Sequence, residues 1–286
     1  MSRSSGWIVS GLSDEAGADL DVQIRAHEEL GWNEIEIRSV YGQAMADWDH
    51  ARFEDVRNRL EQASLHVTAI ASRIANWERP ITHPFEKDLE ELRILADRMN
   101  KLGAKYVRIM SYPNDGLPDM EWRQRVLDRM HQLTELAEAA NITLLHENCS
   151  GWAGSHPGHA LELVEQVNSP HFRLLFDTGN GIAYGYDTFE YLKKVWRYVS
   201  HVHIKDGIRK TGFEEYTLPG EGDSRVRDCL IWLSDHNYSG IISIEPHLHL
   251  IPHLHQSSGS EEAKEAYVAY GQKMERLLRE IYVETT

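Results

Sequence analysis

Four polar residues of metal-ligand type each stand at or near the end of a short apolar run. Glu147 closes ITLLHE, Asp177 closes FRLLFD and Glu245 closes GIISIE, while His203 lies in SHVHIKD. Side chains alternate between the two faces of a strand, so each of these residues shares a face with the residue two positions before it. If the runs are neighbouring parallel strands with these faces turned inward, the four side chains meet at one level.

This set of donors has a definite chemistry. Three carboxylates and one imidazole suit Mn²⁺, Mg²⁺, Co²⁺ or Zn²⁺, and no thiolate is present to select a softer metal. Three carboxylates packed together at low dielectric repel one another unless a cation neutralises them. Any one of the four, taken alone, could instead cap a helix or form a salt bridge. Their occurrence at four consecutive run ends favours one divalent metal site.

The elements that must position these residues are eight short apolar or alternating runs, a pattern typical of strands. The runs cover residues 7–12, 34–38, 66–71, 105–112, 142–149, 172–177, 199–205 and 240–247. Amphipathic patterns typical of helices follow them at 19–31, 48–63, 84–102, 119–140, 158–167, 188–198, 223–236 and 260–281. Strand and helix therefore alternate along the whole chain.

Eight strand-helix units of about 35 residues each predict a single closed parallel (β/α)₈ barrel. The first run ends in the sequence SGLSDE around Gly11, not in the glycine-rich turn of a dinucleotide-binding sheet, which disfavours an open doubly wound fold. We expect one domain over residues 1–286 with a C-terminal helix over 260–282. Two longer connections, 41–47 and the histidine-rich 248–258, are expected to be functional loops.

The composition excludes several function classes. Among 286 residues, 30 Lys and Arg against 45 Asp and Glu give a formal net charge of −15, a field that repels nucleic-acid phosphates and anionic membranes. Two cysteines are too few for a disulfide framework. No signal-peptide core or membrane span is evident near the first residues. We expect a cytoplasmic protein that acts on a small molecule and could form homo-oligomers.

Several segments resemble the xylose-isomerase-like sugar phosphate isomerase/epimerase superfamily, whose members include ketose 3-epimerases, hydroxypyruvate isomerase, and inosose isomerases and dehydratases. The segments are HEN at 146–148, FDTGN at 176–180, HVHIKD at 201–206, PGEG at 219–222, IEP at 244–246 and GWNEIEIR at 31–38. The resemblance extends over nearly the whole chain. Taken together the motifs are specific, although none is specific alone.

The resemblance implies that Glu147, Asp177, His203 and Glu245 hold one divalent ion, and that Glu147 and Glu245 form an acid/base pair across the substrate. Such a site acts on a polyhydroxylated carbonyl compound by removing the proton next to the carbonyl and stabilising an enediolate. Return of the proton isomerises or epimerises the substrate, whereas loss of a neighbouring hydroxyl makes the enzyme a dehydratase. We expect an isomerase or epimerase, with a lyase as the alternative.

Six further residues are predicted to contact substrate. They are Asn180, Lys205, Glu221, His156, Arg38 and Trp152. Many sugar epimerases of this superfamily carry His where this chain has Asn180, and an amide cannot shuttle protons near neutral pH. Lys205 and Glu221 could equally form salt bridges, and Arg38 could hold neighbouring acids in place, as could Arg73 and Arg108. His156 could equally be a solvated or helix-capping residue.

DNA repair by an apurinic-endonuclease-like hydrolase is the alternative from another class of function. Apurinic endonucleases share the barrel and a related Glu, Asp, His, Glu set, but they use three zinc ions and additional histidines, one of them at the position of Asn180. A phosphodiester substrate also calls for a basic face, which the acidic composition does not favour. The histidines at 247, 249, 253 and 255 are irregularly spaced, which disfavours a second metal site there.

Overall fold

Eight parallel strands form a nearly closed barrel in the computed structural model, which describes residues 6–248, 250–251, 256–257 and 260–285. The strands are β1 (Ile8–Gly11), β2 (Glu34–Ile37), β5 (His66–Ala71), β6 (Tyr106–Ser111), β7 (Thr143–Gly151), β8 (Phe172–Asp177), β9 (Val199–Ile204) and β12 (Ile241–Ile244). Their order in the sheet is β1-β12-β9-β8-β7-β6-β5-β2, and a parallel bridge between Leu12 and Glu36 joins the two ends. The predicted (β/α)₈ barrel is confirmed.

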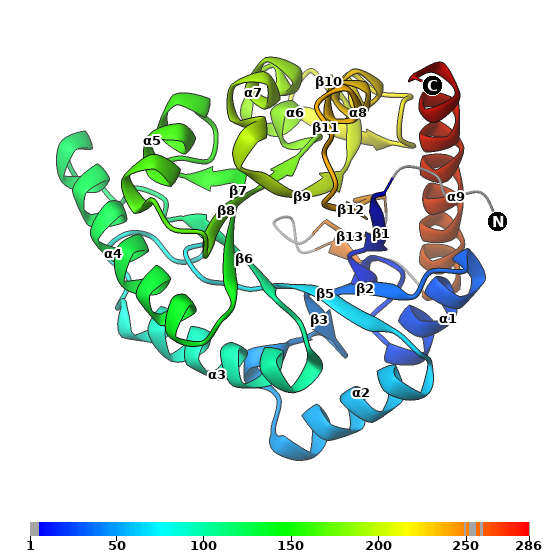
Figure 1. Ribbon diagram of the computed structural model, residues 1–286, viewed down its shortest axis with the longest axis horizontal. Helices are drawn as coiled ribbons and strands as arrows, with labels where there is room; N and C mark the ends of the chain where they lie inside the picture. The colour runs from blue at the N-terminus through cyan, green and yellow to red at the C-terminus, as the bar shows by residue number, and fades with distance from the viewer. Residues whose placement is uncertain (1–5, 249, 252–255, 258–259, 286) are drawn as a thin grey trace.

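An outer layer of helices surrounds the strands (Figure 1). It contains α1 (Leu20–Leu30), α2 (His50–Gln62), α3 (Glu86–Leu102), α4 (Asp119–Ala139), α5 (Pro157–Val167), α7 (Thr188–Val195), α8 (Val226–Asp235) and α9 (Ser260–Thr285). The last of these runs alongside α1. Within the described part of the chain, no helix combines the length and the apolar character that crossing a bilayer would require.

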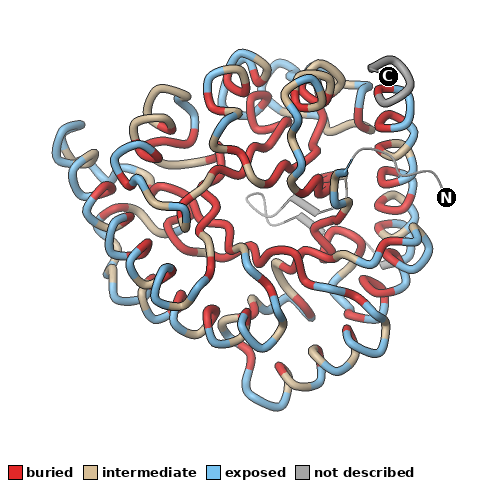
Figure 2. The backbone as a smooth tube through the Cα atoms, in the orientation of Figure 1, coloured by how far each residue is buried: buried red, intermediate tan, exposed pale blue. Residues whose placement is uncertain are grey.

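The core is the layer between strands and helices. Burial is concentrated along the strands, whereas the outer faces of the helices are exposed (Figure 2). Strands covered on both sides read as nearly continuous apolar runs, and this is the pattern that marked them in the sequence. Helix ends follow local rules: the Asp19 side chain accepts the backbone N–H of Asp21 at the start of α1, and Gly31 ends that helix in the left-handed conformation, with φ of 69°.

Several short elements were not predicted, and most of them follow strand ends. Residues 41–47 are not an open loop, because β3 (Ser39–Val40) and β4 (Gln43–Ala44) form a hairpin that is followed by a 3₁₀ turn, η2 (Met45–Asp47). Tyr41 and Gly42 both have positive φ, 54° and 70°, as a tight hairpin turn requires.

A second hairpin is built from β10 (Asp206–Lys210) and β11 (Phe213–Thr217). The remaining short elements are η1 (Ser13–Glu15), α6 (Asn180–Tyr184), η3 (Trp196–Tyr198), β13 (Leu250–Ile251) and β14 (Gln256–Ser257).

Candidate metal centre and active site

Strand register brings the four predicted ligands together at the carboxyl end of the barrel. Asp177 pairs with His203 between β8 and β9, and Ser243, two residues before Glu245, pairs with His203 between β12 and β9. One ligand-type atom from each of Glu147, Asp177, His203 and Glu245 lies within 4.8 Å of all the others, and all four residues are buried. The parallel barrel therefore gathers side chains that are up to 98 positions apart, from Glu147 to Glu245.

The two carboxylate oxygens of Asp177 differ in their surroundings: backbone N–H groups fix one, and the other lies among the candidate ligands. Its Oδ1 accepts the N–H groups of Gly179 and Asn180 at 2.7 and 2.8 Å, at the start of α6. Its Oδ2 makes no hydrogen bond of acceptable geometry among the described residues, although Lys205 Nζ lies 2.8 Å away. A Cβ at Gly179 would lie 2.5 Å from Lys205 Cγ, so the close approach of α6 to β9 requires glycine.

His203 lies between two carboxylates. Its Nε2 is 3.0 Å from both oxygens of Glu36, and its Nδ1 is 3.1 Å from Glu245 Oε2. Burial lowers the pKa of His203, but Glu36 and Glu245 outweigh it and hold that pKa well above its usual value. His201 Nε2 and Ser243 Oγ also donate to Glu36, so this carboxylate is fixed on several sides. Glu36 thereby orients the ring with Nδ1 toward the centre.

Lys205 supplies a positive charge inside the cluster. Its Nζ lies 2.8 Å from Asp177 Oδ2 and 2.9 Å from Glu245 Oε2. Burial raises the pKa of Glu245, but Lys205, His247 and His203 together hold it well below its usual range. For Asp177 burial prevails: although Lys205 opposes it, the pKa of Asp177 is raised. Burial therefore disfavours the charged form of Asp177 even beside the ammonium of Lys205.

Glu147 is held by one cation and one amide. Arg108 Nε lies 3.3 Å from its Oε2, and Asn180 Nδ2 donates to its Oε1 at 3.0 Å. Arg108 is itself 3% exposed, and its Nη1 donates to the carbonyl of Ser72. The carboxylate thus has a fixed direction, which proton transfer to or from a bound molecule requires.

Arg38 pairs with three carboxylates on the opposite wall of the site. Its guanidinium contacts Asp14 at 3.0 Å, Glu15 at 3.3 Å and Glu245 at 3.3 Å. Glu15 also accepts the backbone N–H of His247 at 2.6 Å and contacts its Nδ1 at 2.8 Å. The ligand-type atoms of Glu15, Glu245 and His247 are close enough to form another candidate metal group, as are those of Glu36, His201 and His203. In the first group Arg38 and Lys205 already pair with the acids, and in the second Glu36 holds both histidine rings by hydrogen bonds.

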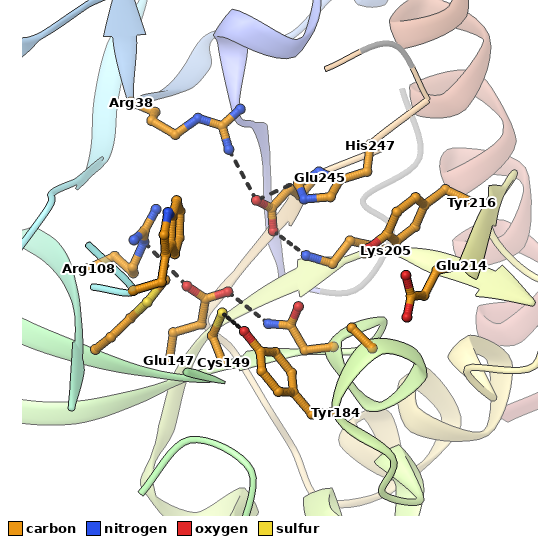
Figure 3. A pocket seen from close by; sticks show the side chains of 14 residues that line it. Arg38, Arg108, Glu147, Cys149, Tyr184, Lys205, Glu214, Tyr216, Glu245 and His247 are labelled. Atoms are coloured by element: carbon orange, nitrogen blue, oxygen red, sulfur yellow. Dashed lines mark hydrogen bonds and ion pairs between the residues drawn. The ribbon is translucent and has the colours of Figure 1, made fainter. Parts of the chain in front are cut away.

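These side chains enclose a cavity of about 440 Å³ (Figure 3). Arg38, Arg108, Glu147, Lys205 and Glu245 point into it from the strands. Residues missed by the sequence analysis complete the walls: Trp77, Met110, Cys149, Ala183, Tyr184, Glu214, Tyr216 and His247. The β10–β11 hairpin contributes Glu214 and Tyr216, and the Tyr216 ring meets His247 edge-on at 5.1 Å. The volume suits one small polar molecule.

Three of the six predicted substrate contacts, Asn180, Lys205 and Arg38, line this cavity. Glu221 does not, because the PGEG turn serves another purpose. Asp206 accepts the backbone N–H groups of Gly220 and Gly222 at 2.8 and 3.0 Å, and a Cβ at Gly222 would lie 2.4 Å from Asp206 Oδ1. The Glu221 side chain instead pairs with Lys273 on α9 at 2.8 Å.

His156 and Trp152 also lie outside the cavity. His156 caps α5, where its Nδ1 accepts the N–H of His159 at 3.3 Å. The His159 ring stacks on Trp152 with centroids 4.7 Å apart, and the His156 ring lies tilted against it with centroids 4.5 Å apart. The stack anchors the start of α5 to the end of β7, so these aromatic rings have a packing role.

The histidine-rich segment is only partly described. His249, His253 and His255 lie outside the described residues. His247 was not expected to contact the site, yet it is buried against Glu15 and lines the cavity. Its position two residues after Glu245 was the signal available in the sequence. Glu36 and Arg108 stood at or within predicted strands, but their partners come from distant parts of the chain.

Comparisons with known proteins agree with this fold. The family model for xylose isomerase-like TIM barrels matches residues 24–269. A 2-epi-5-epi-valiolone 7-phosphate 2-epimerase from an Actinoplanes species is 31% identical over 182 residues, covering 63% of this chain and 64% of the relative. An inosose dehydratase from Clostridium perfringens is 27% identical over 194 residues, covering 57% of this chain and 65% of that protein. The matches therefore span just under two thirds of these curated relatives.

A solved structure supports the same arrangement. A xylose isomerase-like TIM barrel protein from Mycobacterium smegmatis, in complex with magnesium, superposes with a TM-score of 0.69 at 19% identity, covering 96% of this chain and 99% of that one. At this identity the likeness concerns the fold alone. Because the family model covers most of the sequence and the strand order agrees with it, this chain belongs to the xylose isomerase-like TIM barrel family.

Proposed function

We propose that this protein is a divalent-metal-dependent isomerase or epimerase of a small polyhydroxylated carbonyl compound. The observation that carries the proposal is the convergence of Glu147, Asp177, His203 and Glu245, with one donor atom from each within 4.8 Å of the rest. The names of two relatives, 2-epi-5-epi-valiolone 7-phosphate 2-epimerase and inosose dehydratase, support this substrate class.

The residues fit a metal ion on their own chemistry. Three carboxylates and an imidazole in a buried mouth suit a hard or borderline divalent cation. Asp177 Oδ2 is buried and lacks a hydrogen bond of acceptable geometry among the described residues, and Glu36 fixes the His203 ring with Nδ1 toward the carboxylates. A carboxylate holding the outer nitrogen of a ligand histidine is the usual support for a metal site. We propose one ion, of Mn²⁺, Co²⁺, Mg²⁺ or Zn²⁺.

A bound divalent ion would polarise the substrate carbonyl and stabilise the charge that develops on its oxygen. The chain supplies the proton transfers. Glu147, aimed by Arg108 and Asn180, removes the proton from the carbon next to the carbonyl. Glu147 can return the same proton to the neighbouring carbon. For delivery to the opposite face, Glu245 first takes up a proton from solvent and then donates it, and Lys205 beside it can stabilise a negative oxygen. The apolar walls formed by Trp77 and Met110 limit access of water to the carbanion.

The destination of the returned proton decides the reaction. Return to the neighbouring carbon isomerises the substrate, and return to the opposite face of the same carbon epimerises it. Departure of a hydroxyl on the next carbon gives elimination instead. The inosose dehydratase relative keeps elimination as the second candidate, since both reactions begin with the same abstraction.

The proposal is tested by solvent exchange. Protein loaded with Mn²⁺ is incubated in D₂O with keto-sugars, inososes and their phosphates, and deuterium incorporation next to the carbonyl is followed by NMR. We expect exchange with at least one compound, its loss with a chelator, and its recovery when metal is returned. Metal analysis should give one ion per chain. Exchange that persists without metal, or in the double variant Glu147→Gln/Glu245→Gln, contradicts the proposed function.

A further inference from the structure

A second cavity of about 300 Å³ adjoins the metal-centre cavity. Arg38, Trp77 and Arg108 line both, so these three side chains form the partition between them. Beyond the partition, the walls come from η1, the β3–β4 hairpin, the end of β5 and the segment that follows β5. This is the hairpin that replaces the loop predicted at 41–47. None of the chemistry proposed above uses the second cavity.

The arginines around this cavity are already paired with acids. Arg73 contacts both oxygens of Asp47 at 2.7 Å and reaches Glu91 at 3.2 Å. Arg38 and Arg108 have the partners described above. Because Asp14, Asp47 and Glu78 also line the cavity, its charge is balanced without a ligand. A phosphate or carboxylate would have to break these pairs and would meet three acids, so the cavity does not select an anion.

Two buried polar atoms in these walls lack hydrogen-bond partners within the described residues. Asp14, which is 5% exposed, has an unpaired Oδ1, and Arg73 has an unpaired Nε. The first atom accepts and the second donates. Ser72 and Asn76 add neutral polar groups to the same walls. A hydroxyl group both donates and accepts, so a hydroxyl-rich ligand satisfies both kinds of atom.

We infer that the second cavity is a subsite for a neutral, hydroxyl-rich ring joined to the carbonyl compound that reacts at the metal centre. Trp77 on the partition offers an indole surface against which the apolar face of a sugar ring can pack. The substrate class is then a keto-sugar that carries a second sugar or cyclitol ring, in preference to a sugar phosphate. This inference rests on the proposed function, because it extends the substrate of the same site.

Matched ketoses test the inference by calorimetric titration of the Mn²⁺-loaded protein. The probes are D-fructose, D-fructose carrying a neutral glucose ring at O6 (isomaltulose) or a galactose ring at O4 (lactulose), and D-fructose 6-phosphate. We expect at least one of the two-ring ketoses to bind about tenfold tighter than fructose, and the phosphate to bind no tighter than fructose. Equal affinities, including no binding by any probe, or tightest binding by the phosphate would overturn the inference.

Single substitutions test whether the gain in affinity for two-ring ketoses comes from the second cavity. Ala44→Trp places a large ring in the second cavity. The dissociation constant for fructose divided by that for the two-ring ketose should then fall to about 1. Gln43→Trp, at the neighbouring exposed position of β4 and outside the lining, should keep the wild-type ratio. Ala44→Leu is the smaller plug if Ala44→Trp does not fold. A wild-type ratio in a folded Ala44 variant overturns the inference.

The solvent-exchange experiment separates the two proposals. If fructose or another single-ring ketose exchanges its proton in a metal-dependent way and a second ring gives no gain, only the subsite fails. If no compound exchanges under any metal, the proposed function fails.

Discussion

Two fully buried histidines on nearby strands have opposite surroundings. His203 on β9 points into the barrel mouth, where Glu36 and Glu245 lie 3.0 and 3.1 Å from its two ring nitrogens. His146 on β7 belongs to the outward face, where it stacks near Phe172 with centroids 6.4 Å apart, and neither ring nitrogen has a hydrogen-bond partner within the described residues. Burial lowers the pKa of His146 to about 3, whereas the carboxylates around His203 raise its pKa well above the usual value.

The contrast shows what turns a buried polar residue into part of a site. Both rings are removed from water, so burial does not distinguish them. The difference lies in the fixed charges that the neighbouring strands place beside each ring. In the mouth, every candidate ligand has a partner that sets its direction; in the outer layer, His146 is a neutral packing residue. Four substitutions test how the two surroundings differ.

The largest effect is expected from Glu147→Gln, which keeps the shape of the mouth and removes its proposed base. The amide still meets Asn180 but cannot take a proton, so turnover should fall about 10²- to 10⁴-fold. Steady-state kinetics on the substrate found by solvent exchange measures the loss, with circular dichroism as the check on folding. Glu165→Gln, an exposed position on α5, is the control that should retain activity. Unchanged turnover in Glu147→Gln would remove the acid/base assignment.

Lys205→Met tests whether the mouth depends on its internal cation. Without the ammonium, Asp177 and Glu245 face each other with less compensation, and removing one partner of a buried ion pair costs about 3–5 kcal/mol. The melting temperature of the metal-free protein should fall, and added Mn²⁺ should raise it more than in the wild type. Lys193→Met removes a surface lysine paired with Glu190 and serves as the control. Equal metal-induced shifts in wild type and Lys205→Met would show that the lysine and a cation do not compete.

Glu36→Gln tests whether the direction of the His203 ring matters. The amide can still accept from Nε2, but the negative charge that supports the ring is lost, so metal affinity should weaken about 10- to 100-fold. Chelator competition with Zn²⁺ or Mn²⁺ measures the affinity without reference to turnover. Glu34→Gln, on the same strand and paired with the exposed His66, is the matched control. A lower melting temperature with unchanged metal affinity would reduce Glu36 to a structural role.

The positions of the four candidate ligands could be predicted because they depend on rules local to a strand. Alternation identified the inward face, and the shared level of parallel strand ends brought Glu147, Asp177, His203 and Glu245 together without knowledge of any loop. All eight strands were found for the same reason, since burial on both faces leaves apolar runs.

The rest of the site depends on contacts that no local pattern encodes. Glu36 meets His203 across 167 positions, and its partners follow only from barrel closure. Tyr216 reaches the cavity on a hairpin whose turn was not recognised. The PGEG motif was misread because its glycines signal close backbone approach, which here serves Asp206 and leaves Glu221 facing α9. Turn composition predicts a turn but not what the turn holds.

The smallest effect at neutral pH is expected from His146→Leu, which replaces the histidine on the outward face. A neutral apolar side chain removes two buried nitrogens without hydrogen-bond partners, so stability at pH 7 should be equal or slightly higher.

The same substitution should also change how the free energy of unfolding depends on pH. Below its usual pKa of about 6.5, His146 binds a proton in the unfolded chain but not in the native protein, so it costs stability as pH falls from about 6.5 toward 3. Between pH 7 and pH 6 the wild type should lose about 0.7 kcal/mol through this residue, and the variant should not. Urea unfolding at the two pH values measures the difference, and parallel pH curves for the two proteins would mean that the outer layer already hydrates or pairs this ring.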